Sequence, residues 1–239
     1  MLSSYSFIFA VLAGILPALF WLWFWLREDN KSPEPKKLLA RAFFAGMFAV
    51  PLVIPFQFLA SKYFSGYPTI LLLLWATVEE LFKFGSSFFA VFHRKELDEP
   101  IDAVIYLITT ALGFVAIENT LFLLSPMIEN LNGATNFISN SYLADTIITG
   151  NLRFVGASLL HIIASATIGI FIAFSFYKKP KKRNHYTFIG LIVAIALHTI
   201  FNLFIMDENG SNTLVVFSVL WLGVVGLMLF FEKIKSLAH

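Results

Sequence analysis

Long apolar runs, each near the length of a membrane-spanning helix, alternate with short polar segments along the chain. A transmembrane helix needs about 20 predominantly apolar residues, and about seven runs approach or exceed that length. These runs are 5–26, 39–60, 68–92, 101–124, 150–177, 186–206 and 212–231. The pattern predicts an all-α fold, a polytopic bundle of about seven transmembrane helices. We expect residues 1–239 to form a single integral membrane domain.

The composition agrees with a membrane protein. Of the 239 residues, 58% are hydrophobic and only 13% are charged, whereas soluble domains have about 25% charged residues. The absence of cysteine excludes disulfides, thiolate nucleophiles and cysteine-ligated metals. The formal charge of +2 gives no reason to expect a nucleic-acid partner, because the basic residues lie between the apolar runs.

Basic residues mark one side of the predicted membrane. Of the 17 lysines and arginines, all but Lys62, Lys83 and Arg153 follow the first, third, fifth or seventh apolar run or lie close to its end. Segments rich in lysine and arginine stay in the cytoplasm. We therefore expect the N-terminus outside the cell and the C-terminus in the cytoplasm.

The third apolar run contains three ionisable residues, Glu79, Glu80 and Lys83. Each charge near the centre of a membrane helix costs about 2.5–3.5 kcal/mol, even on mild insertion scales. Lys83 lies one helical turn from both glutamates, so an ion pair offsets part of that cost. One carboxylate remains in excess, and this excess is the first indication of chemistry.

Three later runs also contain polar residues. At 1.5 Å per residue, Glu80 lies about 18 Å from the outer end of its predicted helix, His161 about 16 Å, His198 about 12 Å and Glu118 about 9 Å. These depths predict one polar layer in the outer half of a hydrocarbon core about 30 Å thick. A shared site explains such a layer better than independent placement does.

Further polar residues accompany this layer. Asn119 and Asn202 follow the glutamate of the fourth run and the histidine of the sixth, and Arg153 lies near the outer edge of the fifth. We expect them, with Lys83, to support the site. The alternatives are interhelical hydrogen bonding for the asparagines and an interfacial position for the Arg153 head group.

The residue types limit the chemistry. The apolar runs contain no pair of aspartates, and the chain has no Gly-x-Ser-x-Gly or His-Glu-x-x-His motif. The remaining chemistry is a buried glutamate acting as a general base on water, with histidines assisting the oxyanion or the proton transfer. Two histidines and one or two glutamates are also a zinc-ligand set. We expect no metal cofactor, because Lys83 competes with a cation, and zinc is the alternative.

Five segments carry a resemblance to a known family: Val78–Lys83, Glu99–Tyr106, Gly113–Asn119, Arg153–His161 and His198–Asn202. In order and spacing they resemble the motifs of the PrsW family of intramembrane proteases, which are similar to CAAX prenyl endopeptidases and to bacterial immunity-type proteases. The resemblance implies a protease core at about 68–206.

The resemblance also implies roles for residues. Glu79 or Glu80 would be the base, Glu118, His161 and His198 would complete the catalytic site, and Asn202 would assist. The substrate would be a membrane-anchored, single-span protein resembling an anti-sigma factor, cut on the extracytoplasmic side. The location would be the plasma membrane of a bacterium or archaeon. The connection at 125–150, which we expect to form a partly helical outer flap controlling substrate entry, departs from the family.

Two other functions fit the same residues. Intramembrane glutamates and histidines also form the proton relays of transporters, although the chain shows no inverted repeat. A non-catalytic scaffold could bind the transmembrane segment of a partner in a polar cleft. In each case the surroundings are the lipid bilayer, and the sequence predicts no oligomeric state.

Overall fold

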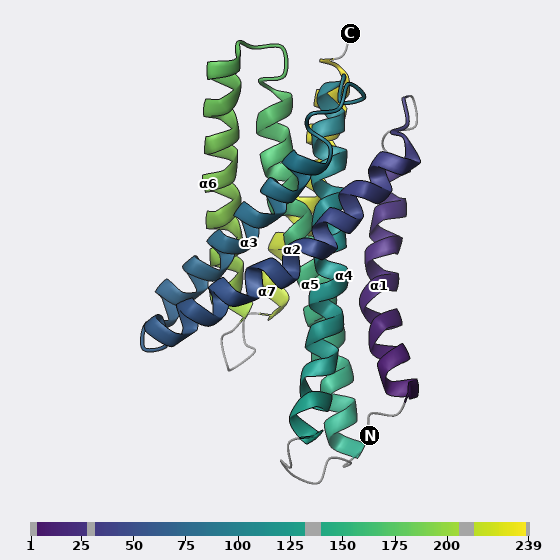
Figure 1. Cartoon of the computed structure of the whole chain (residues 1–239), viewed down its shortest axis with the longest axis vertical. Coiled ribbons are helices and arrows are strands. Elements are labelled where there is room, and N and C mark those ends of the chain that lie inside the picture. The colour runs from purple at the N-terminus through teal and green to yellow at the C-terminus, as the bar shows by residue number, and fades with distance from the viewer. Residues whose placement is uncertain (1–3, 28–31, 132–139, 206–212, 238–239) are drawn as a thin grey trace.

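The computed structural model describes residues 4–27, 32–131, 140–205 and 213–237, and within this part every regular element is a helix (Figure 1). The elements are α1 (Ser4–Leu26), α2 (Lys36–Phe64), α3 (Pro68–Ala90), α4 (Pro100–Leu131), α5 (Asn140–Ala173), α6 (Pro180–Ile205) and α7 (Thr213–Lys235). All except α3 contain a stretch long and apolar enough to cross a membrane. The predicted polytopic helical bundle is therefore confirmed.

The connection expected at 125–150 is largely helical. Helix α4 continues to Leu131 and α5 begins at Asn140, so only 132–139, outside the described residues, separate the two. The apolar run marks only the part of a helix that can lie in hydrocarbon. Helix α4 begins where its run does, but α4 and α5 both extend into the polar residues between their runs, where water can satisfy side chains.

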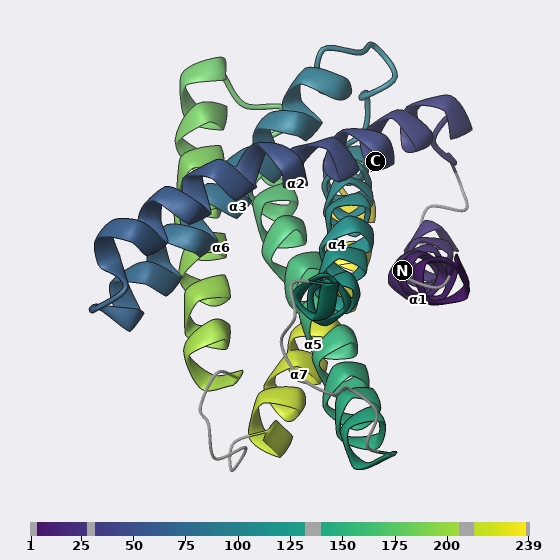
Figure 2. The same ribbon diagram turned by 60° about the horizontal axis from the view of Figure 1, so that its bottom comes forward.

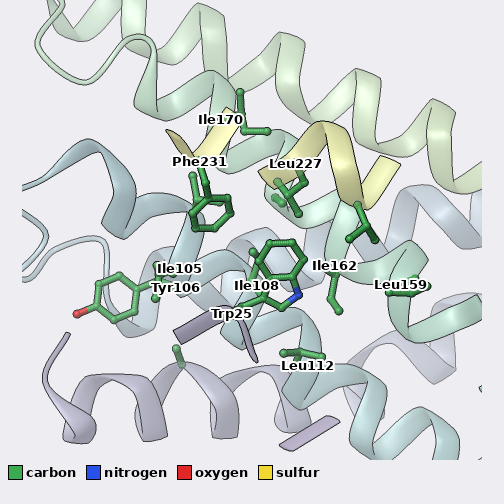
Figure 3. Close-up of a cluster of buried hydrophobic side chains, with 14 of the residues drawn as sticks. Trp25, Ile105, Tyr106, Ile108, Leu112, Leu159, Ile162, Ile170, Leu227 and Phe231 are labelled. Atoms are coloured by element: carbon green, nitrogen blue, oxygen red, sulfur yellow. The ribbon is translucent and has the colours of Figure 1, made fainter. Parts of the chain in front are cut away.

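Helix α4 is the centre of the bundle. Within its apolar span, Pro100–Ser125, an 18-residue window is 94% buried inside the protein, and a helix that is hydrophobic on all sides is expected in such a position. Helices α1, α2 and α5 pack around it. Figure 3 shows one part of this core, where Trp25 of α1 stacks on Phe231 of α7 with ring centroids 5.4 Å apart.

Two glycines allow α2 to cross α4 with their backbones in contact. A Cβ atom on Gly46 would lie 1.9 Å from the Thr110 carbonyl oxygen, and one on Gly113 would lie 1.9 Å from the Phe43 carbonyl oxygen. No larger residue fits at either place without moving a helix. The crossing fixes where the second half of α2 lies relative to α4.

Helices α2 and α3 form a hairpin that runs obliquely to α4, α5 and α6 in both views (Figures 1 and 2). Helix α3 returns beside α2 and also contacts α6. Its buried residues recur at helical spacing and form one face: Leu72, Ala76, Glu79, Glu80, Lys83, Ser87 and Ala90. All three ionisable residues of α3 therefore point into the bundle.

The helices alternate in direction, so that the start of α1 and the end of α7 lie at opposite ends of the bundle (Figure 1). The described basic connections after α3 and α5 lie at the same end as the end of α7. This arrangement agrees with an odd number of spans. The assignment of that end to the cytoplasm stays a prediction from the distribution of basic residues.

Candidate active site

Lys83 connects α3 to α5 in the middle of the site. Its Nζ lies 2.5 Å from Glu80 Oε1 and 2.8 Å from His161 Nδ1, and all three side chains are buried. The ammonium group can only donate hydrogen bonds. Nδ1 of His161 is therefore the acceptor in this contact.

His198 of α6 lies between the two glutamates of α3. Its Nδ1 is 2.7 Å from Glu80 Oε1, and its Nε2 is 3.6 Å from Glu79 Oε2. An ionised carboxylate accepts hydrogen bonds and cannot donate them. We therefore assign the hydrogen of the neutral ring to Nδ1, which leaves the Nε2 lone pair facing Glu79.

His161 of α5 has the opposite arrangement. Because its Nδ1 accepts from Lys83, we assign the ring hydrogen to Nε2, which lies 3.0 Å from Glu118 Oε2 of α4. The two histidine rings meet edge to face, with centroids 4.9 Å apart. Glu118 is the most accessible of the three glutamates, with 40% of its side chain exposed, whereas Glu80 has none.

The two carboxylate oxygens of Glu79 differ: among the described residues, one accepts a hydrogen bond and the other has no hydrogen-bond partner. Gln57 of α2 donates a 2.7 Å hydrogen bond from Nε2 to Glu79 Oε1. Glu79 Oε2 is buried and has no hydrogen-bond partner among the described residues. Gln57 is not among the residues predicted from the sequence, although it is the uncharged polar residue that follows Pro51 and Pro55 in the second apolar run.

A cavity of about 230 Å³ adjoins these groups. Polar and apolar residues from five helices line it: Gln57, Leu72, Trp75, Glu79, Glu118, Asn119, Phe122, Ala157, Leu160, His161, His198, Phe201 and Asn202. Glu80 and Lys83 are not part of its wall and lie behind it. Asn119 is 4% exposed, and its Nδ2 has no hydrogen-bond partner in the described part of the chain.

The structure brings most of the sequence-predicted residues together. Glu79, Glu80, Glu118, His161 and His198 form one connected group, with Lys83 inside it. Asn119 and Asn202 line the same cavity. The side chain of Arg153 lies outside the described residues. Proximity alone tests none of the proposed catalytic roles.

Three of these residues could also serve as metal ligands. Glu79, His161 and His198 each offer one ligand atom, and these atoms all lie within 4.8 Å of one another. This mixture of nitrogen and oxygen donors is one that zinc accepts. Whether these residues can bind zinc depends on which ring nitrogens of His161 and His198 carry hydrogen.

Comparisons with known proteins agree with the resemblance. Residues 34–230 match the model of the "PrsW family intramembrane metalloprotease". Proteins named Protease PrsW are similar to the chain in Clostridioides difficile (29% identity, covering 82% of this chain and 79% of the relative) and Geobacillus kaustophilus (26%, covering 82% and 80%). Another in Oceanobacillus iheyensis is 29% identical, covering 85% and 86%.

No solved structure matches the chain. The family match covers most of the sequence, and the relatives are bacterial proteases. Together with the apolar spans, these findings describe a multi-pass protein of the cell membrane. The chain therefore belongs to the PrsW family of intramembrane metalloproteases.

Proposed function

We propose that the chain is an intramembrane endopeptidase in which Glu79 activates water. The observation that carries this proposal is the pair formed by Glu79 Oε2 and His198 Nε2, 3.6 Å apart on the cavity wall. Both atoms are hydrogen-bond acceptors. A water molecule that donates one hydrogen to each is held with a lone pair directed into the cavity, as a nucleophile requires.

The reaction then follows from this placement. The water oxygen forms a bond to the substrate carbonyl carbon while Glu79 takes its proton. The tetrahedral intermediate collapses with cleavage of the C–N bond, and the proton held by Glu79 passes to the leaving amine. The products are a new carboxylate and a new amine, with no covalent intermediate on the protein.

The developing oxyanion requires hydrogen-bond donors at the cavity wall. Asn119 Nδ2, which has no partner among the described residues, and the amide of Asn202 are on that wall. In a site surrounded by apolar residues, a donor aimed at developing charge is worth more than in water. We assign this role to the two asparagines.

Of the two adjacent glutamates, we propose Glu79 as the base and Glu80 as a positioning residue. Glu80 is fully buried, and its Oε1 already accepts from Lys83 and His198. This carboxylate has no path to a substrate through the cavity wall. By accepting from His198 Nδ1, it keeps the Nε2 lone pair of that ring available for the water.

The family description names a metal, but the tautomers that we assign to the histidines conflict with metal binding. A metal bound by His161 Nε2 requires a lone pair there, and the hydrogen would then move to Nδ1. Nδ1 lies 2.8 Å from the Lys83 ammonium, which is itself a donor and lies 2.5 Å from Glu80. The Nδ1 hydrogen of His161 and the ammonium group of Lys83 would then face each other as two donors. We therefore propose a mechanism that uses no metal.

The site supports cleavage on the outer side. His198 lies about 10 Å along α6 from its end at Ile205 and about 27 Å from its start at Pro180. The Pro180 end carries the basic cluster that predicts the cytoplasmic side. The protease core expected at 68–206 holds all the ionisable groups of the site, and Gln57 adds a contact from before it.

We propose membrane-anchored proteins with a single span, of the anti-sigma-factor type, as substrates. Inside a membrane helix the carbonyl groups are occupied by hydrogen bonds to the backbone. A substrate must therefore present an unwound segment, and a cavity of about 230 Å³ admits only a few extended residues. Such a segment is most easily supplied where a single span ends at the outer boundary.

The test is to incubate the purified chain in detergent with single-span bacterial membrane proteins and to identify products by mass spectrometry. We expect cuts at or just outside the outer boundary of the span. In water enriched in ¹⁸O, the label should enter the new carboxylate. Cuts on the cytoplasmic side would contradict the outer location. Co-purification with intact partners, unaffected by Glu79→Gln, would contradict proteolysis and support a scaffold.

A further inference from the structure

We propose that Gln57 of α2 is a positioning residue that aims the carboxylate of Glu79, an inference that rests on the proposed function. Gln57 Nε2 lies 2.7 Å from Glu79 Oε1, and both residues line the cavity. Gln57 lies outside all five segments that resemble the family motifs, and no role follows for it from the sequence. Its role follows from the contact alone.

The hydrogen bond selects one orientation of the carboxylate. A carboxylate can rotate about its last side-chain bond with little resistance. The amide of Gln57 holds Oε1, and so Oε2 remains the oxygen that faces His198 Nε2 at 3.6 Å. If Oε1 were released, either oxygen could rotate away from the position where a water is held between the two acceptors.

Gln57 is itself held by several neighbours. Its backbone carbonyl accepts hydrogen bonds from Trp75 Nε1 at 3.2 Å and from Ser61 Oγ at 2.8 Å. Trp75 and Glu79 are one turn apart on α3, so Gln57 contacts two successive positions on the same face of that helix. The two contacts that reach α3, to Trp75 and to Glu79, fix the position of α2 along α3.

The proposal predicts a loss of rate more than a loss of substrate binding. Small misplacements of a reacting group can lower a rate by about a hundredfold, whereas a side chain that contacts only Glu79 contributes little to substrate affinity. Gln57→Met keeps a long unbranched side chain and removes the donor. Gln57→Glu keeps the shape and replaces the donor with an acceptor, which repels the Glu79 oxygen.

The first experiment measures kcat and KM for the full chain in detergent, with the single-span protein cleaved fastest in the screen described above as the probe. We expect Gln57→Met to lower kcat about 10- to 100-fold with KM changed less than twofold, and Gln57→Glu to lower kcat further. The matched control is Phe58→Leu on the next position of α2, where the side chain is 71% exposed. Its kinetics should equal those of the wild type.

A second experiment needs no substrate. Thermal unfolding in detergent is compared for Gln57→Met, Glu79→Leu and the double variant. Because neighbouring residues couple and distant ones do not, Gln57→Met should lower Tm in the wild-type chain and have little effect once Glu79 is replaced. If Gln57→Met shifts Tm equally in the wild-type chain and in Glu79→Leu, the proposed coupling between Gln57 and Glu79 is wrong.

The outcomes separate the two claims. Wild-type kcat in Gln57→Met, together with an inactive Glu79→Gln, would overturn the role of Gln57 and leave the base intact. A rise in KM at constant kcat would show that Gln57 binds substrate and would also overturn positioning. Full activity in Glu79→Gln would overturn the proposed base, and with it the residue that Gln57 positions.

Discussion

Glu80 and His198 are joined by a 2.7 Å contact between the carboxylate Oε1 and the ring Nδ1, which connects α3 to α6 on the buried side of the site. The same oxygen accepts a hydrogen bond from Lys83 Nζ, which also contacts His161 Nδ1. One carboxylate therefore contacts His198 directly and is linked to His161 through Lys83. We assign opposite tautomers to the two rings, because His198 donates to this carboxylate whereas His161 accepts from Lys83.

The first prediction concerns these two rings. We expect His198 to carry its hydrogen on Nδ1 and His161 on Nε2, because the first faces a carboxylate and the second accepts from an ammonium group. Nitrogen-15 NMR of histidine-labelled protein in detergent distinguishes the two tautomers. The five histidines are assigned by replacing them one at a time with glutamine.

A metal site would give a different spectrum. If His161 ligates a metal through Nε2, its hydrogen must lie on Nδ1. Observation of that tautomer would contradict both the proton arrangement and the proposal of a metal-free mechanism.

The second prediction concerns the buried charges of Glu80 and Lys83. Removing one member of a buried ion pair leaves the other uncompensated and costs about 3–5 kcal/mol, whereas replacing both can be neutral. We expect Glu80→Gln and Lys83→Met each to lower Tm strongly in detergent and the double variant to recover much of the loss. Additive losses would contradict the pairing. The matched surface pair is Glu232→Gln and Lys235→Met, where single replacements should change Tm little.

The third prediction concerns the crossing of α2 and α4. Gly113→Ala places a methyl group against the Phe43 carbonyl oxygen, at a separation of 1.9 Å before relaxation. Overpacking of this kind typically costs about 1–3 kcal/mol, and a shift of α2 also displaces Gln57. We expect lower Tm and lower activity. Gly85→Ala on α3 is the control, because its methyl group meets nothing within 4 Å and alanine favours a helix.

Much of the fold could be predicted from the sequence. The hydrophobic runs predict seven helices because each must satisfy its backbone hydrogen bonds internally, and the structure has seven in the described part of the chain. At 125–150, where we expected a partly helical connection, the structure extends two of these helices further than the apolar runs do. Hydropathy measures which residues tolerate hydrocarbon, and α4 and α5 both extend into polar sequence, to Leu131 and back to Asn140.

The site was predictable in part. Charged residues in apolar runs are costly, so Glu79, Glu80 and Lys83 could be selected without coordinates. Which glutamate faces the cavity could not, because Glu79 and Glu80 are adjacent and both lie on the buried face of α3. That distinction depends on the position of α6, which brings His198 to Glu80. Gln57 was missed because an uncharged amide in a membrane helix gives only a weak signal.

The fourth prediction concerns metal removal. Because we propose that no step uses a metal, prolonged treatment with a strong chelator followed by dialysis should leave the cleavage rate unchanged. Elemental analysis of the purified protein should find far less than one zinc per chain. Loss of activity after chelation, with recovery on addition of zinc alone, would contradict this mechanism.

The role of Glu79 as the base is tested most directly by the cleavage rate of Glu79→Gln in detergent, with the single-span probe. The change keeps the side-chain volume and an acceptor for Gln57 while removing the base. We expect a loss of at least about a hundredfold in kcat with Tm close to that of the wild type, whereas Glu232→Gln at the surface should retain full activity. A fully folded Glu79→Gln variant that cleaves at the wild-type rate would show that Glu79 is not the base.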